Sequence, residues 1–406
     1  MKILLINQSF VPPDEPGHTR HFEMAQYLRS CGHEMVIVGS DSNYQTGLRS
    51  VERKRLYAQQ TIDGVHVLRA YSAQTLHRSY FWRAVSFISF MFSSVWAALQ
   101  VKDLDLIMGT TPPIFQAVSA WLVALVRRKP ILLEERDQWP EFAIGMGVIK
   151  NPLVIGLAHW LERFLYARAT HILVNSPAYK DHIVRKGVPE SRVTFIPYGT
   201  DINMFNPEVD GSSVREKLGL RDEFIVLYAG AMGQAHDLYT VLRAAGRLSQ
   251  EAPIRFVFFG AGKERSSLER EAGRLGLENV LFAGSSPKQE MPQVIAAADL
   301  CLAILQNIPM FRTTYPNKVF DYMAAARPTV LVIDGVVREL VEASGGGVFV
   351  EPGNDELLAR TILELSRDLR RVRQMGEAAR AYLVKNLDRR DKLAETLRLL
   401  EALVEK

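Results

Sequence analysis

The residues best suited to chemistry lie in a polar run that opens a predicted helix near residue 317. Asn317 and Lys318 fall on the first turn of this helix, where a lysine ammonium can contact phosphate oxygens. Asp321 follows one turn later and can accept hydrogen bonds from ribose hydroxyls. Because positions i and i+3 share one helix face, an ion pair between Lys318 and Asp321 is the competing interpretation. The run predicts a helix that binds a nucleotide diphosphate.

A second candidate phosphate site follows the predicted strand at 225–228. Its loop leads into a helix and contains Gly230, Met232, Gly233 and His236. Glycines let the backbone approach an anion closely, and the free N–H groups at a helix start attract phosphate. We therefore expect this loop to bind the same diphosphate as Lys318.

Two loops in the first half of the chain carry further candidates. The loop 8–20 contains Gly17, whose backbone can approach a diphosphate or a sugar, although a Pro-Gly pair can also simply turn the chain. The run 134–141 follows a predicted strand and contains four acids and one arginine, either as a surface charge cluster or as a functional group. We expect an acceptor hydroxyl to be oriented or deprotonated by carboxylates, either Asp137 and Glu141 or the pair Asp14 and Glu15. Arg136 is a further catalytic candidate of this run.

Metal-binding patterns are weak in this sequence. One Asp-x-Asp, Asp103 with Asp105, precedes a predicted strand, whereas ligands of parallel sheets bind beyond the carboxyl ends of strands. The histidines and cysteines do not have metal-ligand spacing, so we expect no metal and no other cofactor. The two cysteines, Cys31 and Cys301, provide no disulfide framework and indicate a reducing cytosol.

The elements that must position these residues are short strands alternating with helices. The first predicted strands are 3–7, 34–38, 65–69, 104–108, 131–133, 172–174 and 193–196. The later ones are 225–228, 254–258, 280–282, 300–304, 329–332 and 348–350. Such β-branched runs with helical patterns between them are typical of parallel sheets covered on both faces.

The domain boundary is predicted where this alternation stops. Segment 197–213 is rich in Pro, Gly, Asn and Asp and breaks the rhythm of the chain. The predicted fold class is therefore α/β, with two doubly wound, Rossmann-like domains at 1–197 and 198–380. A C-terminal helix at 381–406 is expected to pack back across the first domain.

Composition limits the partners of the chain. Hydrophobic residues make up 48% and charged residues 23% of the 406 residues, which excludes a disordered protein. The net charge is only +4 and no basic run has interleaved aromatics, so we expect no nucleic-acid partner. The uncharged stretch 84–100 falls just short of the ~20 apolar residues that span a bilayer. We expect either a buried helix or one that docks on a membrane surface through Trp82, Phe87, Phe90 and Phe92.

Several of these motifs occur together in one known family. They are the loop Pro12–Gly17, the run Arg136–Glu141, Tyr228 to Gly230 with Gly233, Pro316 through Pro328, and Tyr198 to Asp201 with Phe205. In this order they span nearly the whole chain. The sequence resembles family 4 glycosyltransferases of the GT-B fold and is similar to their WbuB-like N-acetylfucosamine transferase group.

The resemblance implies a GT-B fold, in which two Rossmann-like domains face each other across a cleft. It also implies retaining, metal-independent transfer of a sugar from a nucleotide-diphosphate donor, which we expect to be a UDP-N-acetylaminosugar. The expected acceptor is a glycan or a polyprenyl-diphosphate-linked sugar in the synthesis of a bacterial O-antigen, capsule or exopolysaccharide. We expect a cytoplasmic enzyme, in part peripheral on the cytoplasmic face of the inner membrane. Lys318 would stabilise the leaving diphosphate.

The sequence departs from the family at several donor positions. Thr313 and Asp321 stand where two glutamates are usual, and Ala231 and His236 replace a basic pair in the phosphate loop. A histidine that is common in the first domain corresponds to the region of Arg136. Two alternatives therefore stay open, namely a nucleotide-sugar epimerase or hydrolase on the same fold, and a membrane-associated scaffold that has lost catalysis.

Overall fold

A computed structural model describes residues 1–15, 19–44, 47–52, 56–74, 80–251 and 253–405. The chain forms two compact units. Unit 1 comprises Met1–Pro197 together with Leu393–Lys406, and unit 2 comprises Tyr198–Lys392. Each unit has a parallel β-sheet between helices, so the fold class is α/β, as predicted.

Unit 1 is built on an eight-stranded sheet in the order β3-β4-β2-β1-β5-β6-β7-β8. The strands are β1 (Lys2–Ile6), β2 (Glu34–Ser40), β3 (Tyr57–Ile62), β4 (Val65–Ala70), β5 (Leu106–Thr111), β6 (Ile131–Glu135), β7 (His171–Val174) and β8 (Val193–Phe195). All neighbours pair in parallel except β3, which is antiparallel to β4. Strands β5, β6 and β7 are buried along their whole length, and β1 and β2 along all but their first residue, which explains their continuous apolar runs.

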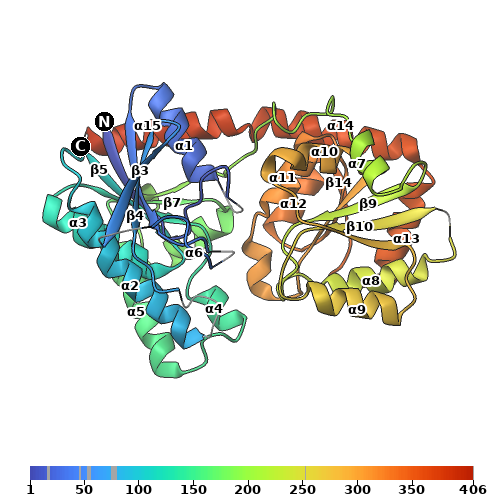
Figure 1. Cartoon of the computed structure of the whole chain (residues 1–406), viewed down its shortest axis with the longest axis horizontal. Coiled ribbons are helices and arrows are strands. Elements are labelled where there is room, and N and C mark those ends of the chain that lie inside the picture. Colours follow the sequence, from blue (N-terminus) through green and yellow to red (C-terminus); the bar gives the residue numbers. More distant parts are fainter. Residues whose placement is uncertain (16–18, 45–46, 53–55, 75–79, 252, 406) are drawn as a thin grey trace. The chain divides into compact units, whose positions relative to one another are not determined.

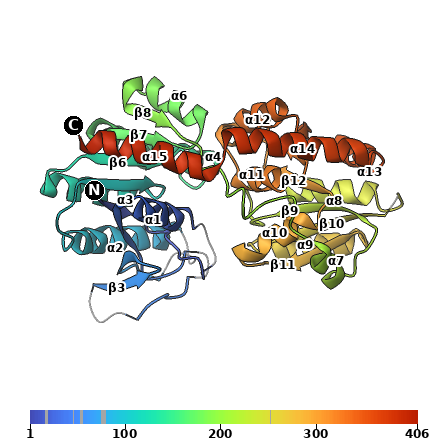
Figure 2. The same ribbon diagram turned by 90° about the horizontal axis from the view of Figure 1, so that it is seen from above.

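Helices cover both faces of this sheet (Figure 1). They are α1 (Arg20–Ser30), α2 (Tyr80–Ala98), α3 (Ile114–Arg127), α4 (Glu141–Gly145), α5 (Pro152–Arg168), α6 (Pro177–Arg185), η1 (Glu190–Arg192) and α15 (Arg389–Val404). Helices α1 and α15 share a core with one face, and α2, α3 and α5 pack on the other. Figure 2 shows α15 and α1 side by side on the first face.

Unit 2 has a six-stranded parallel sheet in the order β11-β10-β9-β12-β13-β14. Its strands are β9 (Phe224–Ala229), β10 (Ile254–Phe259), β11 (Val280–Gly284), β12 (Leu300–Ile304), β13 (Thr329–Val332) and β14 (Gly347–Phe349). Its helices are α7 (Ser212–Lys217), α8 (Leu238–Arg247), α9 (Arg265–Arg274), η2 (Lys288–Glu290), α10 (Met291–Ala296), η3 (Pro309–Thr313), α11 (Asn317–Ala324), α12 (Val336–Ser344), α13 (Asp355–Ser366) and α14 (Leu369–Asn386). Helices α8 and α9 lie on one face, and α10 and α11 on the other (Figure 1).

Each sheet contains one point where the chain reverses the direction in which strands are added. In unit 1 this point lies between β1 and β5, and in unit 2 it lies between β9 and β12. The loops that follow two such strands diverge to opposite faces and leave a crevice at their carboxyl ends, where doubly wound folds bind ligands. The two crevices are therefore the expected ligand-binding sites of the two units.

The end of the chain differs from the prediction of one helix at 381–406. Helix α14 continues to Asn386, and α15 begins only at Arg389. Between them, Leu387 O accepts a hydrogen bond from Thr200 N, and Arg389 N donates to Thr200 O. A Cβ at Gly199 would lie 2.3 Å from Leu387 O at a φ of +60°, so only glycine fits this crossing. The helix breaks here because its backbone pairs with the 199–200 segment instead.

The side of helix α2 that faces the core differs from the predicted one. Phe90 is fully buried and Phe87 is half-buried, whereas Phe92 is 67% and Trp96 is 55% exposed. Trp82 is also exposed, as expected. Among the helices that the structure describes, none combines the length and apolar character needed to cross a membrane.

Candidate functional site

The crevice of unit 2 is formed by two glycine-containing loops whose backbones touch. Gly230, after β9, has a φ of +150°, and its N–H donates to Phe259 O at 2.9 Å. A Cβ at Gly260 would lie only 1.8 Å from Gly230 O, and one at Gly262 only 2.2 Å from Met232 O. Side chains are therefore excluded where the loops meet. Around Gly233 an added Cβ would meet no heavy atom within 4 Å, so this part of the loop borders open space.

Lys318 reaches this loop from the first turn of α11. Its Nζ lies 4.0 Å from the centre of the Tyr228 ring, and a Cβ on Gly230 would lie 2.4 Å from it. Nζ is buried without a hydrogen-bond partner among the described residues. Burial lowers the pKa of Lys318 to about 7. An ammonium group that is desolvated and unpaired favours an anionic ligand.

The position of Lys318 is fixed by Tyr322, one turn further along α11. The Tyr322 hydroxyl accepts a hydrogen bond from Ala229 N at 3.0 Å and donates to Ala229 O at 3.3 Å. It therefore attaches α11 to the end of β9, next to the glycine loop. Tyr228 and Tyr322 both fall within the motifs that resemble the family, but the sequence alone gives neither a role in the site, because both look like ordinary core aromatics there.

Two more groups of the predicted donor site are buried without a partner in the described structure, His236 Nδ1 and Asn317 Oδ1. Burial, and then the charge of Lys318, lowers the pKa of His236 to about 3, so this histidine is neutral at physiological pH. Its ring lies edge-on to Tyr228, with centroids 6.0 Å apart. The site thus offers one cation and neutral polar groups beside a glycine loop.

Asp321 does not form the ion pair with Lys318 that was the competing interpretation. Its Oδ1 accepts a hydrogen bond from Thr200 Oγ1, and Lys318 Nζ bonds to no oxygen of the described residues. The structure therefore places Gly230, Met232, Gly233, His236, Asn317, Lys318 and Asp321 in the β9 loop and the first turns of α11. Gly17 lies outside the described residues.

The crevice of unit 1 opens into a cavity of about 990 Å³. Its polar end lies at the carboxyl ends of β1 and β5 and includes Asn7, Ser9, His21 and Arg136. Its other end is apolar and is formed largely by α4 and α5, with Phe142, Met146 and Leu161.

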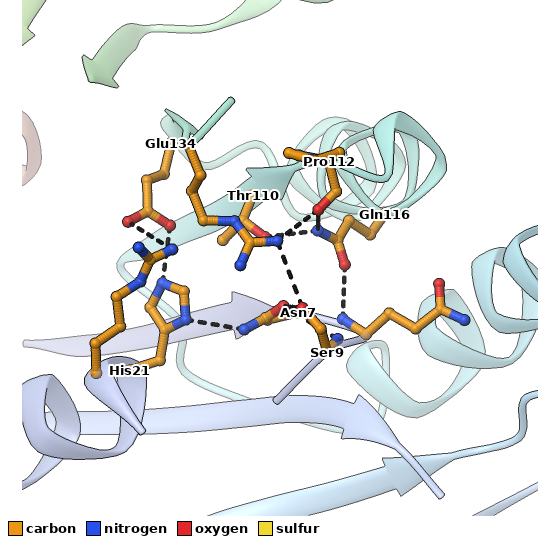
Figure 3. A network of polar contacts seen from close by, with 10 residues as sticks. Asn7, Ser9, His21, Thr110, Pro112, Gln116 and Glu134 are labelled. Carbon is orange, nitrogen blue, oxygen red and sulfur yellow. Dashed lines mark hydrogen bonds and ion pairs between the residues drawn. The ribbon is translucent and has the colours of Figure 1, made fainter. Parts of the chain in front are cut away.

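A chain of buried side chains supports the polar end (Figure 3). His21 Nε2 lies 2.8 Å from Glu134 Oε2, and His21 Nδ1 lies 2.8 Å from Asn7 Nδ2. Although burial disfavours the charge of Glu134, Arg20 and His21 hold the pKa of this carboxyl below its usual value. Burial lowers the pKa of His21 to about 4, so its Nε2–H donates to Glu134 and its Nδ1 accepts from Asn7. Both ring nitrogens are occupied, which makes His21 a positioning residue.

Gln116 ties the loops after β1 and β5 together (Figure 3). Its Oε1 accepts from Gln8 N at 2.6 Å, and its Nε2 donates to Thr110 Oγ1 at 2.6 Å and to Pro112 O at 3.1 Å. Asn7 Oδ1 in turn accepts from Ser9 N and Ser9 Oγ. The sequence could not reveal this network, because several of its contacts join residues more than a hundred positions apart, such as Gln8 with Gln116 and His21 with Glu134.

The three candidates of the 134–141 run lie in different surroundings. Arg136 lines the cavity and donates from Nη2 to Pro112 O and, at 3.5 Å, to Ser9 Oγ. Asp137 is half-buried, and burial raises its pKa. Glu141 forms ion pairs with Lys186 at 2.8 Å and His182 at 3.5 Å, outside the cavity lining.

The arrangement around Glu141 resembles a cation site. Ligand atoms of Glu141, His159 and Glu162 all lie within 4.8 Å of one another. However, the Lys186 ammonium lies 2.8 Å from Glu141 and 2.5 Å from Glu162. The lysine therefore already supplies the positive charge that these carboxylates require. Asp105 of the Asp-x-Asp sequence accepts a hydrogen bond from Lys2 N at the start of β1.

Comparisons with known proteins agree with this geometry. Residues 17–199 match the glycosyl transferase 4-like domain, and residues 223–368 match the glycosyl transferases group 1 domain. A protein of Escherichia coli strain K12 named for glycosyl transfer in colanic acid biosynthesis, WcaI, is 26% identical over 97% of this chain and 98% of its own. The alpha-D-kanosaminyltransferase of Streptomyces kanamyceticus is 26% identical over 55% of this chain and 58% of its own.

Solved structures share the fold over the full length. Anabaena HepE, solved with UDP and glucose, aligns with a TM-score of 0.75 at 19% identity and 99% coverage of both chains. Sucrose-phosphate synthase from Thermosynechococcus elongatus aligns with a TM-score of 0.77 at 18% identity, covering 99% of this chain and 98% of its own. The chain therefore belongs to the family 4-like glycosyltransferases of the GT-B fold, with a glycosyl transferase 4-like domain followed by a group 1 domain.

Proposed function

We propose that the chain transfers a sugar from a UDP-N-acetylaminosugar to a glycan or a lipid-diphosphate-linked acceptor, with retention of anomeric configuration and without a metal. The observation that carries the proposal is the buried Lys318 Nζ, which lies beside the Gly230 loop and has no hydrogen-bond partner in the described part of the chain. An anionic diphosphate would supply the missing partner. The complexes of HepE with UDP and with UDP-glucose favour a uridine nucleotide.

The proposed setting is the assembly of a bacterial surface polysaccharide, either O-antigen, capsule or exopolysaccharide, at the cytoplasmic face of the inner membrane. WcaI is named for the biosynthesis of such a polymer and matches this chain end to end. The exposed aromatic side chains of α2 support a peripheral location.

The chemistry follows from where charge develops. Breaking the bond between the sugar and the diphosphate leaves negative charge on the departing phosphate. Lys318 and the N–H groups of the Gly230 loop would stabilise it, and removal of one such donor typically costs about 3 kcal/mol of barrier, roughly a hundredfold in rate. At the acceptor side, Arg136 would orient the hydroxyl. Asp137 would accept the proton of this hydroxyl, since burial raises its pKa and makes the carboxylate a better base.

Glu141 is not among the residues that line the cavity, so its proposed role is indirect. Its carboxylate lies 2.8 Å from Lys186 Nζ and 3.5 Å from His182 Nε2, and it stands on the first turn of α4. It would act on the acceptor through the position of α4, whose Phe142, Ala143 and Met146 neighbourhood lines the cavity.

Nucleotide binding tests the donor half of the proposal. UDP or UDP-N-acetylglucosamine at about 100 times its Kd should stabilise the wild-type protein by roughly 2.7 kcal/mol, visible as a rise in Tm, and GDP should do so less. Lys318→Ala should abolish most of the rise. Lys217→Ala, which removes an exposed lysine of the same unit, should keep it. A wild-type-like rise in Lys318→Ala would remove this lysine from the site.

Two outcomes would favour the alternatives. If no uridine or guanosine nucleotide raises the wild-type Tm, the chain is a scaffold with a degenerate site. If the protein incubated with a nucleotide sugar alone releases free sugar or an epimer at an enzymatic rate, it is a hydrolase or an epimerase.

A further inference from the structure

We propose that the cavity of unit 1 binds a lipid diphosphate, with the diphosphate against Arg20, Arg83 and Arg136 and the hydrocarbon chain between α4 and α5. This inference rests on the proposed function and names the acceptor class of the same enzyme. It selects a lipid-linked acceptor over a free glycan.

The charged side chains at the polar end of the unit 1 cavity favour a ligand with an anionic group. The charged residues among the described cavity lining are three arginines, Arg20, Arg83 and Arg136, and this lining contains no carboxylate. The nearby Glu134 is already engaged by His21 at 2.8 Å and by Arg20 at 3.7 Å. His21 is neutral, because burial lowers its pKa to about 4. The described lining therefore presents three guanidinium groups and no carboxylate to a ligand, although the carboxyls of Glu134 and Asp137 lie close to Arg20 and Arg136. A diphosphate suits this lining because guanidinium groups donate strong hydrogen bonds to phosphate oxygens.

The N-termini of two helices strengthen the preference of the cavity for an anionic group. Helix α1 begins at Arg20 and α3 begins at Ile114, and the first residues of both border the cavity. The side chains of the N-cap residues, Thr19 and Pro113, make no capping hydrogen bond within the described structure. The partial positive charge of each N-terminus adds to that of the arginines.

The other end of the cavity suits a hydrocarbon chain. Its wall consists of aromatic and aliphatic side chains, including Phe87, Phe115, Trp139, Phe142, Met146 and Ile149. A free glycan, which is covered with hydroxyl groups, would lose hydrogen bonds to water here without replacement. An isoprenoid chain would gain about 0.8 kcal/mol for each CH₂ group that it buries.

The apolar wall also continues to the surface of unit 1. Val154 and Leu157 line the cavity and are nevertheless 47% and 62% exposed. Next to them on α5, Leu153 is 82% and Trp160 is 59% exposed. These four residues form an apolar exit, through which a chain longer than the cavity can continue into a bilayer.

The test uses farnesyl diphosphate as the probe, with inorganic diphosphate and farnesol for comparison. Binding is measured by calorimetry on the full chain carrying Lys318→Ala, so that the nucleotide site does not contribute. We expect farnesyl diphosphate to bind at least tenfold more tightly than either comparison compound. If inorganic diphosphate binds as tightly as farnesyl diphosphate, the cavity does not bind the hydrocarbon chain. If farnesol binds as tightly, the arginines do not bind the diphosphate.

Substitutions at two positions of similar exposure test where the hydrocarbon chain of the ligand lies. Leu157→Asp places a charge in the exit, whereas Leu125→Asp places one at a residue that is 58% exposed on α3 and does not line the cavity. Leu157→Asp should weaken farnesyl diphosphate at least tenfold, and Leu125→Asp should leave its affinity unchanged. The same affinity in both variants would overturn the inference. UDP binding to the chain with Lys318 intact is measured in parallel, so that a failure of the proposed function shows separately as loss of UDP binding.

Discussion

In the proposed donor site, binding should depend most on Lys318, because its ammonium group has no hydrogen-bond partner among the described residues. A lysine in water is charged up to pH 10, whereas burial lowers the pKa of Lys318 to about 7. At a pH between about 7 and 10, the Lys318 side chain is therefore charged in the unfolded protein and neutral in the folded one. The free site is therefore partly neutral at physiological pH, and a diphosphate that binds there must restore the ammonium.

This protonation predicts how nucleotide binding depends on pH. Below pH 7 Lys318 is already charged, so its contribution to UDP affinity is constant. Above pH 7 binding takes up a proton, and the Kd for UDP should rise towards about tenfold per pH unit up to pH 9. Calorimetry at pH 8 in two buffers of different ionisation enthalpy should detect the proton uptake. Lys318→Arg, which stays charged over this range, should bind UDP with a much flatter pH dependence. Equal slopes for the two proteins would assign the titration to another group.

At the scale of elements, the contact between the loops after β9 and β10 shapes the proposed donor site. Gly260 has a φ of +147°, and its missing Cβ leaves room for Gly230 O. The loops can therefore share hydrogen bonds such as Met232 N to Ala261 O at 2.8 Å. This close packing holds the Gly230 backbone beside Lys318.

We expect Gly260→Ala to disturb both stability and binding. The new Cβ would lie 1.8 Å from Gly230 O in a backbone conformation that alanine disfavours, so the loop must move. The free energy of unfolding should fall by about 1–3 kcal/mol, and UDP affinity should fall at least tenfold. Gly273→Ala on α9, where an added Cβ meets nothing within 4 Å, is the control. It should keep the affinity and raise stability by up to about 1 kcal/mol. Normal UDP binding by Gly260→Ala would contradict the role given to this contact.

Sequence patterns predicted the buried strands well, because each is a short β-branched run that must be apolar on both sides. They missed β3, whose sequence Tyr57-Ala-Gln-Gln-Thr-Ile62 is polar and half-exposed at the sheet edge. They also gave α2 the wrong phase at Phe90, since a helix that is apolar all round does not reveal which side faces the core. Contacts such as His21 with Glu134 need the fold, because their partners are 113 residues apart.

At the scale of the whole molecule, the surface of unit 1 differs from an ordinary solvated surface. Helices α2, α3 and α5 cover the same face of the sheet and contact one another in sequence. Large apolar side chains are exposed on all three, namely Ile88, Phe92, Trp96, Leu125, Val126, Leu153, Leu157 and Trp160. Exposed basic residues stand beside them, namely Arg128, Lys129, Arg163 and Arg168. Apolar side chains with neighbouring cations are typical of surfaces that bind anionic membranes.

This surface predicts binding to anionic lipid vesicles. The full chain should sediment with vesicles that contain phosphatidylglycerol, and much less with vesicles of phosphatidylcholine alone, because the arginines and lysines add about 1 kcal/mol each near a negative surface. Phe92→Ser combined with Trp96→Ser should lower the partition coefficient at least tenfold, since both rings are more than half exposed and would enter the interface. Leu369→Ser, at a residue of unit 2 that is 59% exposed, is the matched control and should partition like the wild type. If the double variant also partitions like the wild type, α2 is not the docking helix, and the exposed aromatics need another explanation.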